Sequence, residues 1–527
     1  MKRLTLALPA LLLAGCSMTP AYERPQAVVP PSWPVGDAYL RQSEATLPAL
    51  TFEQVFTDPR LRTLVGQALV NNRDLRIAAA NIRAARAQYR IQRADLLPQV
   101  DASGRYSYRG TGNGATTTTI PGTGTGTGGT GTGTGNGGTG TGTGGTIVTS
   151  SRSPSSFSLD LGATAFEIDL FGRIRSLTEA EQNRYFATEA GARATRLTLV
   201  GDIAEAWAAY GADRSLMAIS EATAASARRS VTLTRARLQG GVAPRTDLRQ
   251  AEQILATAES DLAEQRTQLA QDVNALQLLV GAPIDPALLP ASIDRVLPTI
   301  ANLPAGVDSG ILLRRPDVVQ AEYELLAANA DIGAARAALF PRLSLTGLVG
   351  FASDALRTLF TGGAFNYSVA PSLSYPIFRA GAGRAGVEFS QAQRDALLAT
   401  YERTIQSAFR EVSDALARQG TITEQTRADR ANLDAAQDTF RLTEARYRGG
   451  IDTFLSSLDA QRSYYTAQRR LVATQLVAAT NRVTLYRTLG GDSLLEAGPD
   501  GPVPAADTAA SASDRTPAQA GVQSQDR

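Results

Sequence analysis

The spacing of apolar residues along the chain alternates between the period of a helix and the period of a strand. Residues 59–70 and 73–97 are rich in Ala, Arg and Leu and predict two helices. Asp58-Pro59 is typical of an N-cap followed by proline at the first helical position. Pro98 ends the second helix. A strand with one apolar face is predicted next, because polar residues alternate with Val100, Ala102, Gly104, Tyr106 and Tyr108.

A second strand and two long helices are predicted after it. Apolar residues alternate again from Phe157, and the phase of this alternation shifts near Ala165–Phe166, which predicts a bulge. No strong helix breaker occurs from about 173 to 239, and Gly240-Gly241 ends that stretch. Another helix is expected from Pro244 to Val280. Its leucines have the heptad spacing of a coiled coil and are expected to serve packing: Leu248, Leu255, Leu262, Leu269 and Leu276.

The same succession then occurs again, which predicts an internal duplication. A helix over 316–339 ends at Leu339-Phe340-Pro341, as the earlier helix ends at Leu96-Leu97-Pro98. Two strands are expected within 342–378, followed by a long helix over about 383–448 and a last helix over 452–489. Gly449-Gly450 ends the long helix, as Gly240-Gly241 does in the first copy.

These patterns divide the chain into six expected segments. They are a signal peptide at 1–15, an extended Pro-rich arm at 16–58, a first repeat at 59–280, a connector at 281–308, a second repeat at 309–490 and a disordered tail at 491–527. The β-hairpins are expected at 99–170 and 342–378, and the helical hairpins at 173–280 and 380–490. Residues 111–149 are nearly all Gly and Thr and predict a flexible loop.

The N-terminus has the pattern of a bacterial lipoprotein signal. Lys2-Arg3 precedes an apolar run from Leu4 to Ala14, which is shorter than the roughly 20 residues that span a bilayer. The run ends Leu13-Ala14-Gly15-Cys16, which resembles a lipobox and implies cleavage before Cys16 and a lipid on that residue. Ser17 after it resembles the signal of lipoproteins destined for the outer membrane. The alternative is an ordinary signal peptide that contains a cysteine.

Composition excludes most kinds of chemical site. The chain has no histidine and one cysteine, so His-based catalysis, His- or Cys-ligated metal sites and disulfides are excluded. Removal of Lys2 and Arg3 with the signal peptide lowers the basic residues from 52 to 50, which equals the 50 acidic residues. A neutral chain without basic clusters is a poor nucleic-acid binder. We therefore expect no enzyme, no metal, no cofactor besides the covalent lipid, and no nucleic-acid partner.

The lengths of the predicted elements indicate an oligomeric membrane protein. The helix over 173–239 would be about 100 Å long, close to the combined length of the shorter helices over 73–97 and 244–280. No apolar run of 18 or more follows the signal peptide, and the strands have about ten residues, as transmembrane strands do. Four strands cannot close a barrel, whereas a trimer would supply twelve. The alternative is a soluble α+β protein with a small open sheet.

Several segments, taken together and in order, resemble the TolC/OprM family of outer membrane factors, in particular the lipoprotein channels of tripartite efflux systems. The resemblance runs from Cys16 to about Gly491, and the Gly/Thr tract departs from the family, whose corresponding external loop is usually shorter. The segments are Pro20-Ala-Tyr22-Glu-Arg24-Pro25, Phe56-Thr-Asp58-Pro59-Arg-Leu61, Phe166-Glu-Ile-Asp169-Leu-Phe171-Gly172-Arg173, Arg314-Arg315-Pro316-Asp317, Pro371-Ser-Leu-Ser-Tyr-Pro376-Ile-Phe378 and Arg446-Tyr447-Arg448-Gly449-Gly450-Ile451-Asp452.

This resemblance implies an α+β membrane protein: a homotrimer with a long α-helical coiled-coil barrel and a 12-stranded transmembrane β-barrel. It implies a lipid-anchored protein of the bacterial outer membrane that reaches into the periplasm. The implied partners are outer-membrane lipid, a periplasmic adaptor protein and an inner-membrane RND-type transporter. The implied function is passive conduction of drugs or other small toxic compounds.

The resemblance also implies a gate at the tips of the helical hairpins. Tyr447, Arg448 and Asp459 match the family's gate positions, and the forked guanidinium of Arg448 could bond a carboxylate of a neighbouring protomer. Some members of the family have Asp at the position of Ser456. The alternative is that these residues are solvated helix-end charges, each worth under about 1 kcal/mol.

The two turns at the tips are candidate contacts for the adaptor. They consist of Gly240, Gly241, Val242 and Ala243 in the first hairpin and Gly449, Gly450, Ile451 and Asp452 in the second. Because Gly-Gly also ends helices in general, plain turn chemistry explains these residues as well, and both roles can hold together.

Two other functions are compatible with the sequence. The first is a duct for another cargo, either metal ions in a heavy-metal efflux system or polypeptides in a type I secretion system. The second is a non-conducting surface scaffold or adhesin lipoprotein that uses the Gly/Thr loop.

Overall fold

The computed structural model of the chain describes residues 18–25, 29–30, 51–108, 155–303 and 309–504. The expected signal peptide, Cys16, the Gly/Thr tract and the last part of the tail lie outside these residues. The chain forms two compact units, here called the sheet unit and the hairpin unit, which are described separately. The sheet unit comprises Met1–Tyr22, Arg86–Gln182 and Ala327–Arg394, and the hairpin unit comprises Glu23–Ala85, Asn183–Leu326 and Asp395–Arg527.

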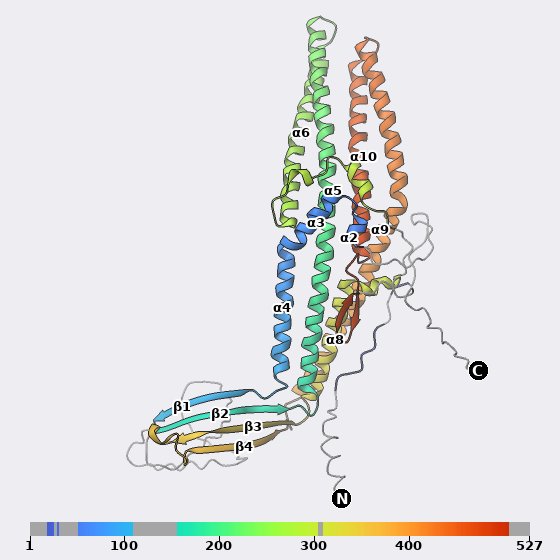
Figure 1. The fold of residues 1–527 in the computed structure, drawn as a ribbon. Helices are drawn as coiled ribbons and strands as arrows, with labels where there is room; N and C mark the ends of the chain where they lie inside the picture. The colour runs from blue at the N-terminus through green and yellow to red at the C-terminus, as the bar shows by residue number, and fades with distance from the viewer. Residues whose placement is uncertain (1–17, 26–28, 31–50, 109–154, 304–308, 505–527) are drawn as a thin grey trace, which may run out of the picture. The chain divides into compact units, whose positions relative to one another are not determined.

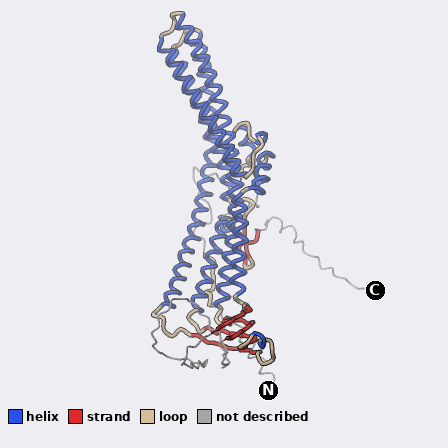
Figure 2. The backbone as a smooth tube through the Cα atoms, turned by 90° about the vertical axis from the view of Figure 1, so that its left-hand side faces the viewer, coloured by secondary structure: helices blue, strands red, loops and turns tan. Residues whose placement is uncertain are grey.

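The described residues are mostly helical, with some strands (Figures 1 and 2). The helices are α2 (Phe52–Val55), α3 (Pro59–Asn71), α4 (Arg73–Ala94), α5 (Arg173–Gln239), α6 (Arg245–Val280), α7 (Ile293–Val296), α8 (Pro316–Ala337), α9 (Ala382–Arg448) and α10 (Phe454–Thr488). In this part of the chain, no helix combines the length and the apolar character needed to cross a membrane.

Four strands form one antiparallel sheet in the sheet unit. They are β1 (Val100–Tyr108), β2 (Ser155–Ile168), β3 (Arg342–Ser353) and β4 (Phe365–Ser374), and they lie side by side in the order of the sequence (Figure 1). β1 and β4 are the outer strands, and neither pairs with a further strand among the described residues. Each therefore presents one edge of unpaired backbone groups.

The predicted bulge lies in β2. The register between β2 and β3 shifts between Ala163 and Phe166, and Ala165 has a φ of +54°. The amide of Ala165 donates to Thr346 Oγ1 of β3 at 3.2 Å. The bulge explains why the apolar positions of β2 change face at this point.

The register gives the sheet one apolar face. Ala102, Leu161, Val349 and Tyr367 are directly paired and form a row across the four strands. The neighbouring row on the opposite face is largely polar and consists of Ser103, Asp160, Gly350 and Asn366. Large apolar side chains remain exposed in this single chain, among them Leu161, Val349, Tyr367, Val369 and Leu373. The apolar face thus has no cover within the sheet.

The hairpin unit contains two helical hairpins, formed by α5 with α6 and by α9 with α10. In both hairpins, long helices are joined by a short turn (Figure 1). The core of the unit includes Trp207 of α5, whose Nε1 donates to the Leu288 carbonyl oxygen at 3.0 Å. The ring of Phe56, just before α3, and the ring of Tyr486 in α10 form a T-shaped pair with their centroids 5.5 Å apart.

The helix start predicted from Asp58 and Pro59 is confirmed at α3. The Asp58 carboxylate accepts a hydrogen bond from the Arg60 amide at 2.8 Å, and Pro59 is the first helical residue. α4 and α8 end at Ala94 and Ala337, slightly before the predicted ends at 97 and 339. A single turn at each helix end accounts for the difference, as Leu97 and Phe340 still donate to carbonyls three residues back.

The expectation of a disordered tail from 491 is wrong for its first part. β5 (Leu495–Gly498) and β6 (Gly501–Pro504) form an antiparallel hairpin. Leu495 is fully buried in a cluster with Phe186 and Tyr323. The Tyr323 hydroxyl donates to the Gly498 carbonyl oxygen at 2.9 Å and accepts from the Gly498 amide at 3.0 Å. The composition of residues 495–504 indicates disorder. The burial of Leu495 and the two hydrogen bonds between Tyr323 and Gly498 nevertheless hold this segment in a defined conformation.

Candidate functional site

The two helical hairpins end in turns of the same geometry. In the first turn, Gly241 has a φ of +72°, and the Val242 amide donates to the Arg237 carbonyl oxygen at 2.9 Å. In the second turn, Gly450 has a φ of +76°, and the Ile451 amide donates to the Arg446 carbonyl oxygen at 2.9 Å. This is the Schellman motif, which satisfies helix carbonyls and favours glycine at the left-handed position.

Both turns present an apolar side chain to solvent. Val242 is 71% exposed, and Ile451 is 68% exposed. Leu455, in the first turn of α10, is also exposed. Gly240 and Gly449 are exposed, whereas Ala243 and Asp452 are partly covered. Turn chemistry explains the glycines, but none of the residues that the structure describes covers these apolar side chains.

Tyr447 lies between the two hairpins and is buried, with 7% exposure. It belongs to a cluster with Val231 of α5, Ala251 of α6 and Phe454 and Leu458 of α10. The ring centroids of Tyr447 and Phe454 are 5.3 Å apart. The Tyr447 hydroxyl has no hydrogen-bond partner among the described residues. Its aromatic ring, rather than its hydroxyl, therefore holds the tips together in the single chain.

Arg237, which is not among the residues predicted from the sequence, reaches Tyr447 from the other hairpin. The guanidinium carbon of Arg237 lies 4.7 Å from the centre of the Tyr447 ring, and Nη1 donates to the Tyr447 carbonyl oxygen at 3.0 Å. A cation over an aromatic ring and a charged hydrogen bond to a carbonyl are both attractive. This pair directly links the end of α5 to the end of α9.

A comparison of the two turns explains why Arg237 reaches across. Arg446 occupies the corresponding place in the second turn and forms a two-point ion pair with Asp452, at 2.7 and 3.0 Å. Hydrogen bonding to Arg446 lowers the pKa of Asp452. The first turn has Ala243 where the second has Asp452, so Arg237 has no carboxylate in its own turn. The sequence therefore contained a sign that Arg237 bonds outside its own turn, because the carboxylate present in the second turn is absent from the first.

The single chain does not bring Arg448 and Asp459 together. Arg448 Nη2 donates to Glu444 Oε1 at 2.6 Å, one helical turn earlier on α9. Asp459 is exposed and makes no hydrogen bond or ion pair with the described residues. Exposed pairs such as Arg448–Glu444 are worth under about 1 kcal/mol, so they exchange partners readily.

A cavity of about 190 Å³ lies near the tips, lined by Tyr447, Arg448 and residues of α5 and α10.

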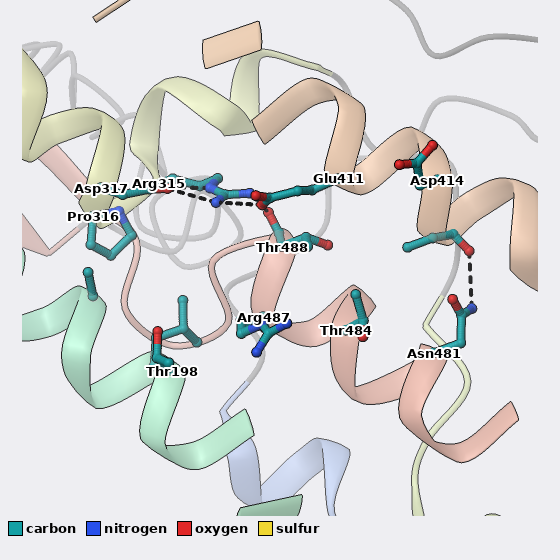
Figure 3. Close-up of a pocket in the computed structure, with 13 residues that line it drawn as sticks. Thr198, Arg315, Pro316, Asp317, Glu411, Asp414, Asn481, Thr484, Arg487 and Thr488 are labelled. Atoms are coloured by element: carbon teal, nitrogen blue, oxygen red, sulfur yellow. Dashed lines mark hydrogen bonds and ion pairs between the residues drawn. The ribbon is translucent and has the colours of Figure 1, made fainter. Parts of the chain in front are cut away.

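Arg315, in one of the segments that carry the family resemblance, has a structural role in the hairpin unit. Its buried guanidinium donates to Asp317 at 2.7 Å, to Glu411 of α9 at 3.0 Å and to the Thr488 carbonyl oxygen of α10 at 2.9 Å (Figure 3). It therefore fixes the start of α8 against two other helices. These residues line a cavity of about 490 Å³. In the described part of the chain, no cluster of three or more carboxylates is placed to hold a metal ion.

Comparisons with known proteins agree with this architecture. The family model "Outer membrane efflux protein" matches residues 64–282 and 309–491. The toluene efflux pump outer membrane protein TtgC of Pseudomonas putida is 41% identical over 490 residues, which cover 93% of this chain and 95% of TtgC. The antibiotic efflux pump outer membrane protein ArpC of Pseudomonas putida has the same identity and coverage.

A solved channel shares the fold. The open state of the Neisseria gonorrhoeae MtrE outer membrane channel superposes with a TM-score of 0.75 at 33% identity, covering 90% of this chain and 98% of MtrE. The helical hairpins, the strands and these matches lead to one conclusion. The chain belongs to the outer membrane efflux protein family, whose members are non-enzymatic channels of the outer membrane that extend into the periplasm.

Proposed function

We propose that the chain is the outer-membrane channel of a tripartite efflux pump, with a gate at the tips of its helical hairpins. The observation that carries the gate is the Arg237–Tyr447 contact, which joins the ends of the two hairpins of one protomer. Arg448 and Asp459 are the proposed second link, between neighbouring protomers. Their exposure and the weak local pairing of Arg448 support this role, since both side chains are available to a partner.

The sheet supports assembly into a trimer. β1 and β4 each leave one edge unpaired, and backbone groups cannot stay unpaired in lipid. Three copies of a four-stranded sheet supply twelve strands, enough for a closed transmembrane barrel with its apolar face toward lipid. The same element order, with a helix, two strands, a long helix and a shorter helix, occurs twice and supports two structural repeats.

The exposed Val242 and Ile451 are proposed to contact a periplasmic adaptor protein, which in turn engages an RND-type inner-membrane transporter. Small exposed apolar side chains on rigid turns suit docking to another helical protein. Cys16 is proposed to carry the lipid anchor. The names of TtgC and ArpC, which refer to toluene and antibiotics, support small apolar or amphiphilic toxic compounds as cargo.

Complementation of a strain that lacks its own outer-membrane efflux channels tests this function. The chain, expressed with a compatible adaptor and transporter, should restore resistance to toluene and to antibiotics. Ile451→Asp places a charge on the adaptor contact and should abolish resistance without changing the amount of protein in the outer membrane. Leu442→Asp, at an exposed apolar residue of α9, is the matched control. Full resistance with Ile451→Asp would contradict the docking site.

A further inference from the structure

The described part of the N-terminal arm lies along α8 in a fixed register. Asn329 Nδ2 donates to the Pro20 carbonyl oxygen at 2.8 Å. Further along the arm, Arg24 donates through Nε and Nη2 to the two carboxylate oxygens of Glu322, at 2.6 and 2.7 Å. Because the residue number on α8 falls as the number on the arm rises, the arm runs antiparallel to this helix.

A glycine in α8 makes room for the arm. A Cβ atom on Gly333 would lie 2.8 Å from both the backbone nitrogen and the Cα of Thr19, closer than a real Cβ approaches another atom. Gly333 lies inside a helix and is not among the glycines with positive φ, so helix geometry does not call for glycine there. The close passage of Thr19 accounts for it. Thr19 Oγ1 is also 3.1 Å from Ser176 Oγ of α5.

The arm also supplies a positive charge to a buried carboxylate. Glu322 is 3% exposed, whereas the Arg24 side chain is 45% exposed. A buried carboxylate is destabilising unless it is paired, and the two-point bond from a guanidinium is the strongest form of such pairing. Release of Arg24 would therefore remove a two-point ion pair from the buried Glu322 carboxylate. The arm is held by two features, a backbone slot at Gly333 and an ion-pair clamp at Glu322.

We propose that residues 18–25 form an intramolecular strap that fixes where the N-terminal lipid anchor leaves the folded chain. The inference uses the proposed lipidation of Cys16 but not conduction or gating. Cys16 is three residues before Thr19, and an extended chain spans at most about 3.6 Å per residue, so the anchor stays within about 11 Å of the Thr19 Cα. Ser176, Asn329 and Gly333 belong to the sheet unit. The seated strap thus holds the acyl chains close to the unit that contains the four strands.

The yield of a disulfide cross-link measures whether the strap contacts α5 as it does in the structure. Thr19→Cys with Ser176→Cys places two thiols where hydroxyls now lie 3.1 Å apart, in an oxidising compartment. We expect efficient cross-linking in the otherwise unchanged full-length protein. Gly333→Val, which blocks the slot, and Arg24→Ala, which opens the clamp, should each lower the yield at least about tenfold. Arg427→Ala, which removes an exposed pair with Glu424, is the control and should leave the yield unchanged.

Assembly in the outer membrane tests what the strap does. Arg24→Ala should lower the yield of lipidated oligomer in the outer membrane about tenfold, with the lipid confirmed by intact mass. In Arg24→Ala that also carries Thr19→Cys and Ser176→Cys, the few cross-linked molecules should be found in the oligomer, and the molecules without the cross-link should not. Arg24→Ala with Glu322→Gln also removes the buried negative charge but still leaves the arm without its two-point bond to α8, so its oligomer yield should stay low.

Two results would overturn the proposal. The first is normal oligomer yield in Arg24→Ala although its cross-link is lost. The second is full recovery in the Arg24→Ala, Glu322→Gln double variant without recovery of the cross-link, which would mean that only the buried charge matters. Neither result depends on whether the oligomer conducts, so failure of the strap and failure of the proposed channel function are distinguishable.

Discussion

The guanidinium of Arg237 lies over the ring of Tyr447, with 4.7 Å between the guanidinium carbon and the ring centre. The two residues lie on different hairpins, 210 positions apart in the sequence. Their contact gives the tips of one protomer a direct bond that does not require the neighbouring protomers. A gate built from this bond and from links between protomers would have two separable components.

Removal of the Arg237 side chain should loosen the gate proposed at the hairpin tips. Loss of the cation–π contact and the hydrogen bond costs about 1–2 kcal/mol, which raises the open fraction about tenfold. Uptake of a large antibiotic such as vancomycin by cells producing Arg237→Ala measures this. Arg235→Ala removes a nearby exposed arginine that pairs with Glu252 and should behave like wild type. Equal uptake in both variants would exclude Arg237 from the gate.

Substitutions of Tyr447 separate its ring from its hydroxyl. Tyr447→Phe should leave the melting temperature unchanged or slightly raised, because the buried hydroxyl has no partner among the described residues. Tyr447→Ala should lower the free energy of unfolding by about 3 kcal/mol, because it empties the cluster between the hairpins. A melting temperature that falls equally in both variants would show that the hydroxyl is bonded in the assembled channel.

The two glycines of the first turn should respond differently to alanine. Gly241 has a φ of +72°, so Gly241→Ala should destabilise the hairpin by about 1 kcal/mol. Gly240 is not among the glycines with positive φ, and a Cβ there meets no atom closer than 3.5 Å. Gly240→Ala should therefore be neutral. Hydrogen exchange of the turn amides distinguishes the variants, and equal protection in both would contradict the Schellman assignment.

Stability should fall as pH rises toward neutrality because of Asp213. Burial, together with the adjacent Asp272 carboxylate, raises the pKa of Asp213 to about 7. Between an unfolded value near 3.8 and about 7, the folded state holds a proton that the unfolded state has released. The free energy of unfolding should thus decline over this range and level off above it. After allowance for solvent screening, the decline is about 1–2 kcal/mol.

Asp213→Asn is the variant that tests this dependence. It should abolish the decline and be more stable than wild type at pH 8, as measured by thermal melting from pH 4.5 to 8. Asp285→Asn is the control. It changes an exposed carboxylate that caps a short helix of the connector, and it should have no comparable effect, because its side chain accepts a hydrogen bond from the Ala287 amide and is not the residue beside Asp272. An unchanged slope in Asp213→Asn would show that its carboxyl is ionised in the folded channel.

Features determined by neighbouring residues could be predicted from the sequence, whereas contacts between distant residues could not. The cap at Asp58, the bulge near Ala165 and the turns at Gly241 and Gly450 follow from local chemistry, and the structure shows each of them. Arg237–Tyr447 and Arg24–Glu322 join residues 210 and 298 positions apart. The ordering of β5 and β6 depends on a pocket that exists only after Phe186 and Tyr323 come together.

Single-channel conductance of the purified mature oligomer in planar bilayers tests the central claim most directly. Wild type should show a small conductance, and Asp459→Ala and Arg237→Ala should each raise it, with the double variant highest because the two links are separate. Arg235→Ala should match wild type. No conductance from any variant, in an oligomer verified as folded, would contradict the channel and favour a surface scaffold.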